Sequence, residues 1–197
     1  KEEKEEKEEK KEKKEGGEEE VRDLFVCKEN LYLKVSESQI IRPTSSQLKG
    51  VYSRLSRMAV QNDYYKLFSI KATDTDKQIA HKHKEMLVKY SPGKFSDDPV
   101  AACEADEQLR LVKDVFDNVL KEEKKKKIYM QLCAYRKQYP LLLNTTSQKP
   151  VKELMCIAYN LTILLKAMKK ESFPRPLLKE VEQALMMLPS AMREMFE

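Results

Sequence analysis

Apolar residues recur at a spacing of three and four positions through most of this 197-residue chain, and this periodicity limits its fold more than any other feature. Five segments show it, at residues 45–61, 74–90, 100–120, 151–170 and 177–188. Each segment would place its apolar side chains on one face of an amphipathic helix. Only four glycines and eight prolines supply turns, which is too few for an all-β fold. We therefore predict an all-α protein.

The ends of these helices follow from short polar side chains and from prolines. We expect N-caps at Ser45, at Asp63 and at either Asp74 or Asp76, because such side chains accept hydrogen bonds from free backbone N–H groups. A further helix, basic at its start, is expected over Lys121–Tyr139. The second and third segments are joined by a loop of about ten residues, a length that predicts an antiparallel hairpin. A short extended segment is expected before Pro43.

The charge of the chain is unevenly distributed. Residues 1–20 hold seven Lys and eleven Glu and no apolar side chain, so this segment has a net charge of −4. The whole chain is +5, which leaves the remaining residues at +9. A segment that cannot bury apolar surface cannot offset the entropy cost of folding. We predict that residues 1–20 form a charged low-complexity tail, disordered or transiently helical.

The cysteines and histidines predict no metal site. The four cysteines, at positions 27, 103, 133 and 156, form no CxxC pair, and we expect reduced, unpaired thiols. His81 and His83 lie two apart, so on a helix they point to different faces. The chain also has no Gly-rich phosphate loop and no G-x-S-x-G motif. We therefore predict a protein that is not an enzyme and that uses no metal ion, no cofactor and no catalytic residue.

No stretch of the sequence has the about 18 consecutive apolar residues of a membrane-spanning helix. The start of the chain is charged rather than apolar, which also excludes a signal peptide. With the expected free thiols, this predicts a cytoplasmic or nuclear protein. Because the chain begins with Lys1 rather than Met, we expect it to be a piece of a longer polypeptide.

Four short motifs stand in an order and spacing that match a known family. They are Asp63-Tyr64-Tyr65-Lys66-Leu67, Thr75-Asp76 with Ile79, Lys89-Tyr90 with Pro92 and Lys94, and Val119-Leu120 followed eight residues later by Ile128-Tyr129. With these motifs the segment Asp63–Tyr129, about a third of the chain, resembles the J domain of DnaJ-type co-chaperones. The resemblance implies a J-like helical hairpin at the centre of the chain.

The tripeptide that acts in that family is changed in this sequence. J domains carry His-Pro-Asp between the two hairpin helices, and this tripeptide contacts a DnaK-type chaperone and triggers its ATP hydrolysis. The corresponding residues here are Ser91, Pro92 and Gly93. A hydroxyl and a hydrogen cannot supply the aromatic donor or the charged acceptor that the family offers its partner. We expect no ordinary stimulation of a chaperone ATPase.

The resemblance also departs from the family at the end of the third helix. One more residue stands between Phe116 and Val119-Leu120 than in the family pattern, and Lys121-Glu122-Glu123 replaces the usual Ser-Asp-Pro. We expect these changes to alter the fourth helix and to leave the hairpin intact.

The second helix keeps the positive charge that the family uses for docking. Its lysines, with one in the following loop, are Lys77, Lys82, Lys84, Lys89 and Lys94. The resemblance implies electrostatic docking on a DnaK-type chaperone, or a regulatory contact with another J protein. The alternative interpretation is that these lysines form only the solvated face of an amphipathic helix.

A second basic cluster lies at the start of the predicted fourth helix. It consists of Lys124, Lys125, Lys126 and Lys127, with Arg136 and Lys137 further along the chain. Four lysines can neutralise several phosphates, but a lysine is a point charge that does not read bases. This cluster predicts at most a non-specific RNA contact. The competing interpretation is the solvated start of a helix.

These observations divide the chain into four parts. We predict a charged tail at 1–20, an N-terminal segment with an amphipathic helix at 21–62, a J-like domain at 63–139 and a C-terminal helical unit at 140–197. The Leu- and Met-rich helices of the last part are expected to pack against the J-like part or to bind a partner protein. The predicted function is that of a non-enzymatic J-like interaction or co-chaperone-like scaffold protein. The alternative is a structural subunit of a ribonucleoprotein.

Overall fold

The computed structural model describes residues 40–95, 97–145 and 151–194. Within these ranges all regular structure is helical, which confirms the predicted all-α fold. The α-helices are α2 (Ser45–Gln61), α3 (Tyr64–Leu67), α4 (Asp76–Lys89), α5 (Pro99–Val115), α6 (Glu123–Arg136), α7 (Tyr139–Thr145), α8 (Val151–Lys170), α9 (Arg175–Leu185) and α10 (Ser190–Glu194). The predicted charged tail and most of the expected extended segment lie outside the described residues.

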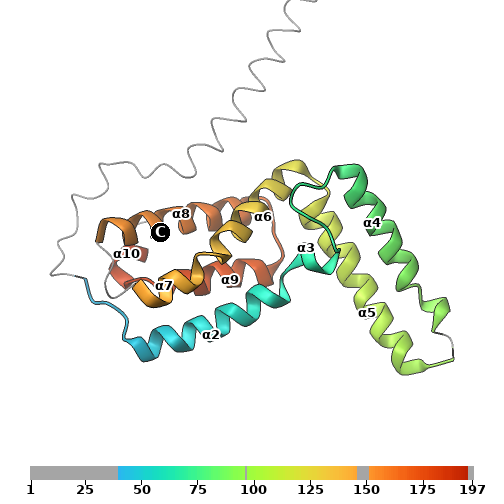
Figure 1. Cartoon of the computed structure of the whole chain (residues 1–197), viewed down its shortest axis with the longest axis horizontal. Helices are drawn as coiled ribbons and strands as arrows, with labels where there is room; N and C mark the ends of the chain where they lie inside the picture. Colours follow the sequence, from blue (N-terminus) through green and yellow to red (C-terminus); the bar gives the residue numbers. More distant parts are fainter. Residues whose placement is uncertain (1–39, 96, 146–150, 195–197) are drawn as a thin grey trace, which may run out of the picture.

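The helices are arranged as a bundle with a hairpin projecting from one end (Figure 1). α4 and α5 pack against each other as the predicted antiparallel hairpin. α6 leads from the base of this hairpin into the bundle, where it packs on α8. In the bundle, α8 packs on α9 and α10, and α2 packs on α7 and α9. The hairpin is therefore an arm held at its base.

Two predicted N-caps are wrong by one residue. Thr44, not Ser45, caps α2, and Thr75, not Asp74 or Asp76, caps α4. In both cases the threonine accepts from the backbone N–H of a glutamine three residues later, and that glutamine side chain accepts in return. This reciprocal capping box satisfies two free donors instead of one, and it can form only at the threonines, because the predicted serine and aspartates have no glutamine or glutamate three residues later. The predicted cap at Asp63 is confirmed at the start of α3.

A π-helical turn, Phe116–Leu120, continues α5 at its C-terminal end. The backbone N–H of Lys121 donates to the carbonyl of Phe116 over 2.9 Å, one residue further than in an α-helix. The turn lies where the sequence has one residue more than the J-domain pattern. The wider turn takes up this residue, so that Val115 before it and Val119 within it both stay fully buried.

The predicted helix over Lys121–Tyr139 is shorter than expected. α6 begins at Glu123 and ends at Arg136, and the separate helix α7 begins at Tyr139. Pro140 lies in the first turn of α7, where the missing N–H of proline is not needed for an intrahelical hydrogen bond. The proline therefore lies at the start of a second helix.

One continuous cluster of buried apolar side chains joins the central helices α3 to α6 to the C-terminal helices. Leu55 of α2, Tyr129 of α6, Leu161 of α8 and Val181 of α9 have no exposed surface. Complete burial of an aliphatic side chain contributes roughly 1.5–3 kcal/mol each. Four methionines of the last third also belong to this core, namely Met155, Met168, Met187 and Met192. These thioethers fill the interior of the bundle.

The cysteines differ from the expectation at one position. Cys103 and Cys133 are free thiols, whereas Cys156 is disulfide-bonded, so the prediction of reduced thiols throughout is wrong at Cys156. Spacing along the chain reveals local metal motifs, but a disulfide depends on proximity in three dimensions.

Candidate functional site

The three residues at the position of the J-domain tripeptide lie at the end of the projecting hairpin (Figure 1). Pro92 begins a short 3-10 turn, Pro92–Lys94, and the N–H of Lys94 donates to the carbonyl of Ser91 over 3.0 Å. Pro92 and Gly93 are exposed and Ser91 is half-buried. The tripeptide is therefore accessible to a partner, and it offers a hydroxyl and a proline ring but no charged side chain.

The outer face of α4 carries a stripe of exposed side chains. Lys77, His81, Lys84 and Val88 follow one another at spacings of four, three and four, which places them on one side of the helix. Val88 is 61% exposed, a large value for a branched apolar residue on a helix that has a packed face. The stripe combines positive charge with one exposed apolar side chain.

Three of the five predicted docking lysines surround one shallow depression. This depression has a volume of about 550 Å³ and is lined by His81, Lys84, Glu85, Val88, Lys89 and Lys94. Lys94 comes from the turn at the tip, and the others come from the last three turns of α4. The structure thus brings Lys84, Lys89 and Lys94 together beside the degenerate tripeptide.

The five lysines are not equivalent. The Nζ of Lys82 lies 2.7 Å from Glu85, and this hydrogen bond is the main cause that lowers the pKa of the Glu85 carboxyl. Lys89 lies over the ring of Tyr90, with its Nζ 5.1 Å from the ring centroid. Within the described part of the chain, Lys77, Lys84 and Lys94 have no carboxylate partner. These three lysines, two on α4 and one in the turn after it, are the cations that the hairpin offers to a partner.

The cluster Lys124–Lys127 is arranged differently, because each of its lysines contacts a carboxylate. The pairs are Lys124 with Glu171 at 3.0 Å, Lys125 with Glu122 at 3.2 Å, Lys126 with Asp76 at 2.6 Å and with Glu123 at 2.7 Å, and Lys127 with Glu123 at 4.0 Å. Lys126 is itself buried, and hydrogen bonds to Asp76 and then to Glu123 raise its pKa. The cluster fastens the start of α6 to α4 and to the end of α8, and only part of its charge faces solvent.

The two histidines occupy different environments, as the sequence predicts. His81 is exposed on the stripe of α4, and its Nε2 lies 3.2 Å from Glu85. His83 faces the other helix of the hairpin, where its ring stacks on Phe116 with centroids 3.8 Å apart. Its Nε2 is shielded from solvent without a hydrogen-bond partner, and burial lowers the pKa of the imidazole. His83 is thus a packing residue at the base of the π-helical turn.

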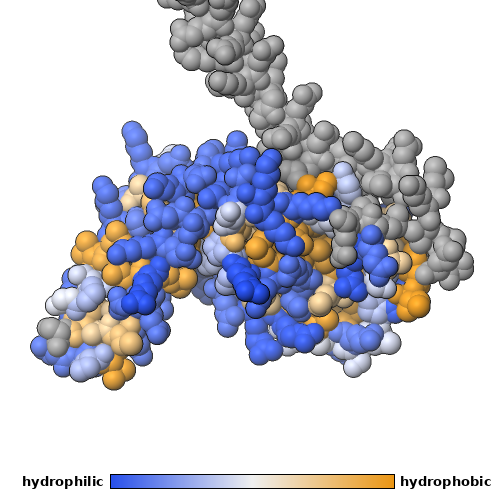
Figure 2. Space-filling model, turned by 180° about the vertical axis from the view of Figure 1, so that it is seen from behind, coloured by the Kyte–Doolittle hydropathy of each residue, from blue (hydrophilic) through white to orange (hydrophobic). Residues whose placement is uncertain are grey.

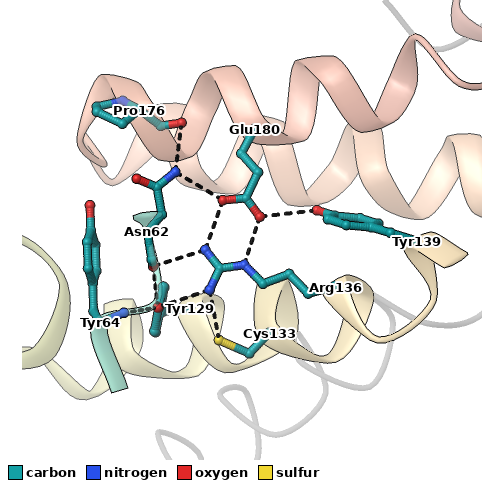
Figure 3. Close-up of polar contacts among 8 residues, drawn as sticks. All are labelled: Asn62, Tyr64, Tyr129, Cys133, Arg136, Tyr139, Pro176 and Glu180. Carbon is teal, nitrogen blue, oxygen red and sulfur yellow. Dashed lines mark hydrogen bonds and ion pairs between the residues drawn. The ribbon is translucent and has the colours of Figure 1, made fainter. Parts of the chain in front are cut away.

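A buried polar network fixes the base of the hairpin to the bundle (Figure 3). The hydroxyl of Tyr129 donates to the carbonyl of Asn62 over 2.7 Å and accepts from the N–H of Tyr64 over 2.8 Å. Burial is the main cause that raises the pKa of Tyr64 to about 12. Tyr129 thereby ties α6 to the segment that joins α2 and α3.

Arg136 continues this network towards α9 (Figure 3). Its Nε and Nη2 donate to the two carboxylate oxygens of Glu180 over 2.7 and 2.8 Å, and Nη2 also donates to the carbonyl of Asn62. Glu180 has no exposed surface and also accepts from the hydroxyl of Tyr139. Burial by itself lowers the pKa of Arg136, but the hydrogen bonds and charge of Glu180 outweigh it and raise the pKa.

The sequence analysis missed this network, because it counted Arg136 among the cations beyond the basic cluster. A signal for it was present in the apolar stripe of α9, where Glu180 stands three residues after Leu177 and one before Val181. Both of those neighbours are fully buried. A carboxylate at a core position requires a cation or several donors.

In the described part of the chain, no group of three or more His, Cys, Asp and Glu side chains is placed to hold a metal ion. No described helix combines the length and the apolar character of a membrane span. The chain matches no protein-family model, and no significantly similar curated protein or solved structure was found. The surface of the hairpin and the network at its base are therefore the features from which function is argued.

Proposed function

We propose that this chain is a non-enzymatic, J-like protein-interaction module, acting as a co-chaperone-like scaffold, that docks on its partner through α4. The observation that carries the proposal is the depression at the hairpin tip, where Lys84, Lys89, Lys94 and the exposed Val88 lie beside the degenerate tripeptide. An exposed arm with unpaired cations supports electrostatic docking on an acidic protein surface. In the view of Figure 2 the projecting arm, on the left, shows apolar side chains beside hydrophilic ones.

The proposal separates docking from triggering. Docking uses charge on α4, which is retained, whereas triggering in J domains uses the imidazole and carboxylate of the tripeptide, which are absent at Ser91 and Gly93. The module therefore occupies the J-domain site of a DnaK-type chaperone without accelerating ATP hydrolysis. A contact with another J protein is the second partner that the resemblance implies.

The ribonucleoprotein alternative has less support than docking. The candidate RNA surface is Lys124–Lys127. Each of these lysines already contacts a carboxylate, and Lys126 is buried. To bind phosphate groups, the lysines would have to break these ion pairs, and the free energy lost would offset part of the electrostatic free energy of RNA binding.

A competition assay tests the proposal. A DnaK-type chaperone is stimulated by an authentic J protein, and the steady-state rate of ATP hydrolysis is followed as this chain is added. We expect the chain to lower the stimulated rate in a concentration-dependent way and to leave the basal rate unchanged.

Charge reversal identifies the surface in the same assay. Changing Lys84→Glu together with Lys94→Glu should abolish the competition. The matched control, Lys49→Glu with Lys113→Glu, reverses the charge of two exposed lysines on α2 and α5 and should leave competition intact. Equal loss in both double variants, or no competition by the native chain, contradicts docking through α4.

A further inference from the structure

A second pocket lies away from the hairpin, in the groove where α8, α9 and α10 meet. Its volume is about 470 Å³, within the range of roughly 300–1,000 Å³ that small-molecule sites occupy. None of its lining residues belongs to the surface of α4. Docking through the hairpin therefore does not account for this pocket.

The floor of the groove is apolar. Leu165 of α8 and Leu185 of α9 both line it and are 8% and 9% exposed. Met186 stands beside them and is 46% exposed, among the most exposed of the large apolar side chains in the described bundle. An open methionine next to two nearly buried leucines forms an adaptable apolar wall.

The rim of the groove is mainly cationic. Lys166 and Lys169 stand on successive turns of α8, and Arg193 approaches from α10. Glu182 is the one carboxylate among the lining residues, and it lies 3.5 Å from Lys169. The lining therefore carries an excess of positive charge above an apolar floor.

One donor on this rim has no acceptor. The Nε–H of Arg193 is shielded from solvent and has no hydrogen-bond partner. A buried donor is normally satisfied by protein, by water or by a ligand, and a guanidinium nitrogen prefers a negatively charged oxygen. Arg193 lines the groove, so this orphaned donor belongs to a side chain of the cationic rim.

We propose that the groove between α8 and α9 binds a small amphipathic anion, with a carboxylate or phosphate group on a short apolar body. The anionic group lies between Arg193 and Lys166, and the apolar body covers Leu165 and Leu185. The carboxylate and phosphate versions share this chemistry. The site is independent of the surface of α4, so the two are tested separately.

Fluorescence of 8-anilinonaphthalene-1-sulfonate, an amphipathic anion, tests the site in the whole chain. We expect saturable binding of one probe per chain, with a dissociation constant below about 1 mM. Decanoate and decyl phosphate should displace the probe, and the stronger of the two shows which anionic group the site prefers. Displacement by decyltrimethylammonium equal to that by decanoate overturns the proposal, because the cation matches the apolar floor alone.

Substitutions connect this binding to the groove. Arg193→Gln or Lys166→Gln should raise the dissociation constant at least about tenfold, the effect of losing one charge-assisted hydrogen bond. Arg110→Gln and Lys113→Gln, which remove the same charges from exposed positions of α5, should not change it. Equal affinity in pocket variants and controls overturns the proposal.

Amide chemical shifts of the native chain provide a test that does not depend on the folding of any variant. On titration with decanoate, the shifted amides should cluster in α8, α9 and α10. Shifts confined to α4 and α5, or spread evenly over the chain, contradict binding in this groove.

Discussion

The guanidinium of Arg136 and the carboxylate of Glu180 form a bidentate ion pair, with N–O distances of 2.7 and 2.8 Å, in the interior of the protein. Glu180 has no exposed surface and the side chain of Arg136 is 11% exposed. The pair joins the last residue of α6 to α9, 44 positions later in the chain. The helix that follows the hairpin is therefore fixed to α9 through a buried ion pair.

Breaking this pair should destabilise the whole chain. Glu180→Gln leaves the buried guanidinium without its counter-charge, and we expect a loss of about 3–5 kcal/mol in the free energy of unfolding, measured by urea denaturation. The matched control is Glu182→Gln, which removes the exposed partner of Lys169 and should cost less than about 1 kcal/mol. Similar losses in both variants would show that the buried pair does not hold the two parts together.

The π-helical turn predicts that one deletion is tolerated. Removing Asn118 shortens the π-helical turn Phe116–Leu120 by one residue. An ordinary α-helical turn can then replace the π-helical turn, and Val115 and Val119 stay buried. We expect a stability change within about 1 kcal/mol, apart from the exposed hydrogen bond of Asn118 to Asp114.

The matched deletion is that of Glu107, which is exposed in the middle of α5. It rotates the first half of α5 by about 100° relative to the second and removes Ala105 from the core. Thermal unfolding of both variants distinguishes the cases. If the two deletions lower the unfolding temperature equally, the π-helical turn does not contain an extra residue that the fold can lose.

Stability should fall on acidification through His83. Burial lowers the pKa of His83 in the folded state, with Asp117 acting in the opposite direction and Lys113 and Lys121 in the same direction. Below about pH 6.5 the unfolded chain therefore binds a proton that the folded chain does not, so the free energy of unfolding decreases as the pH falls.

His83→Phe keeps the stack on Phe116 and removes the titrating group. Urea denaturation between pH 7 and pH 5.5 should show a smaller pH dependence for this variant than for the native chain. His81→Gln, which changes the exposed histidine of α4, should keep the native pH dependence. If His83→Phe and the native chain lose stability in parallel, His83 is not the group responsible.

RNA binding provides a test of the ribonucleoprotein alternative. Because Lys124–Lys127 already contact carboxylates, we expect that changing the exposed Lys124 and Lys127 to Gln alters the affinity for unspecific single-stranded RNA less than about twofold at 0.15 M salt. Fluorescence anisotropy over a range of salt concentrations measures this. A tenfold loss with a reduced salt dependence would instead favour an RNA surface on α6.

Much of the architecture was predictable from apolar periodicity, and the reasons are local. The predicted helix over residues 45–61 is α2, apart from its N-cap, and the predicted stripe at 151–170 is α8. The hairpin of α4 and α5 followed from two stripes joined by a short loop. Each of these features depends only on neighbouring residues, which a sequence pattern records directly.

The candidate surface was only partly predictable, because ion pairing depends on residues that are distant in the sequence. From the sequence, the five lysines on or near α4 are equally good candidates for docking, whereas in the structure Lys82 forms an ion pair with Glu85. It also shows Lys124–Lys127 as a basic cluster, although Asp76, about fifty positions earlier, neutralises Lys126. The Arg136–Glu180 pair and the groove that contains Arg193 likewise arise only when remote helices meet.

The tip of the hairpin can accept the residues that J domains carry there. A Cβ placed on Gly93 has no heavy atom within 4 Å, and the backbone of Gly93 does not have a positive φ. Ser91→His with Gly93→Asp therefore rebuilds the tripeptide around the existing Pro92 without a steric clash at position 93.

The steady-state ATPase rate of a DnaK-type chaperone with this double variant decides whether the arm docks without triggering. We expect the native chain to leave the basal rate unchanged, the double variant to raise it several-fold, and the addition of Lys84→Glu and Lys94→Glu to remove the gain. Stimulation by the native chain, or a folded double variant that leaves the rate unchanged, would contradict a docking arm that has lost only its trigger.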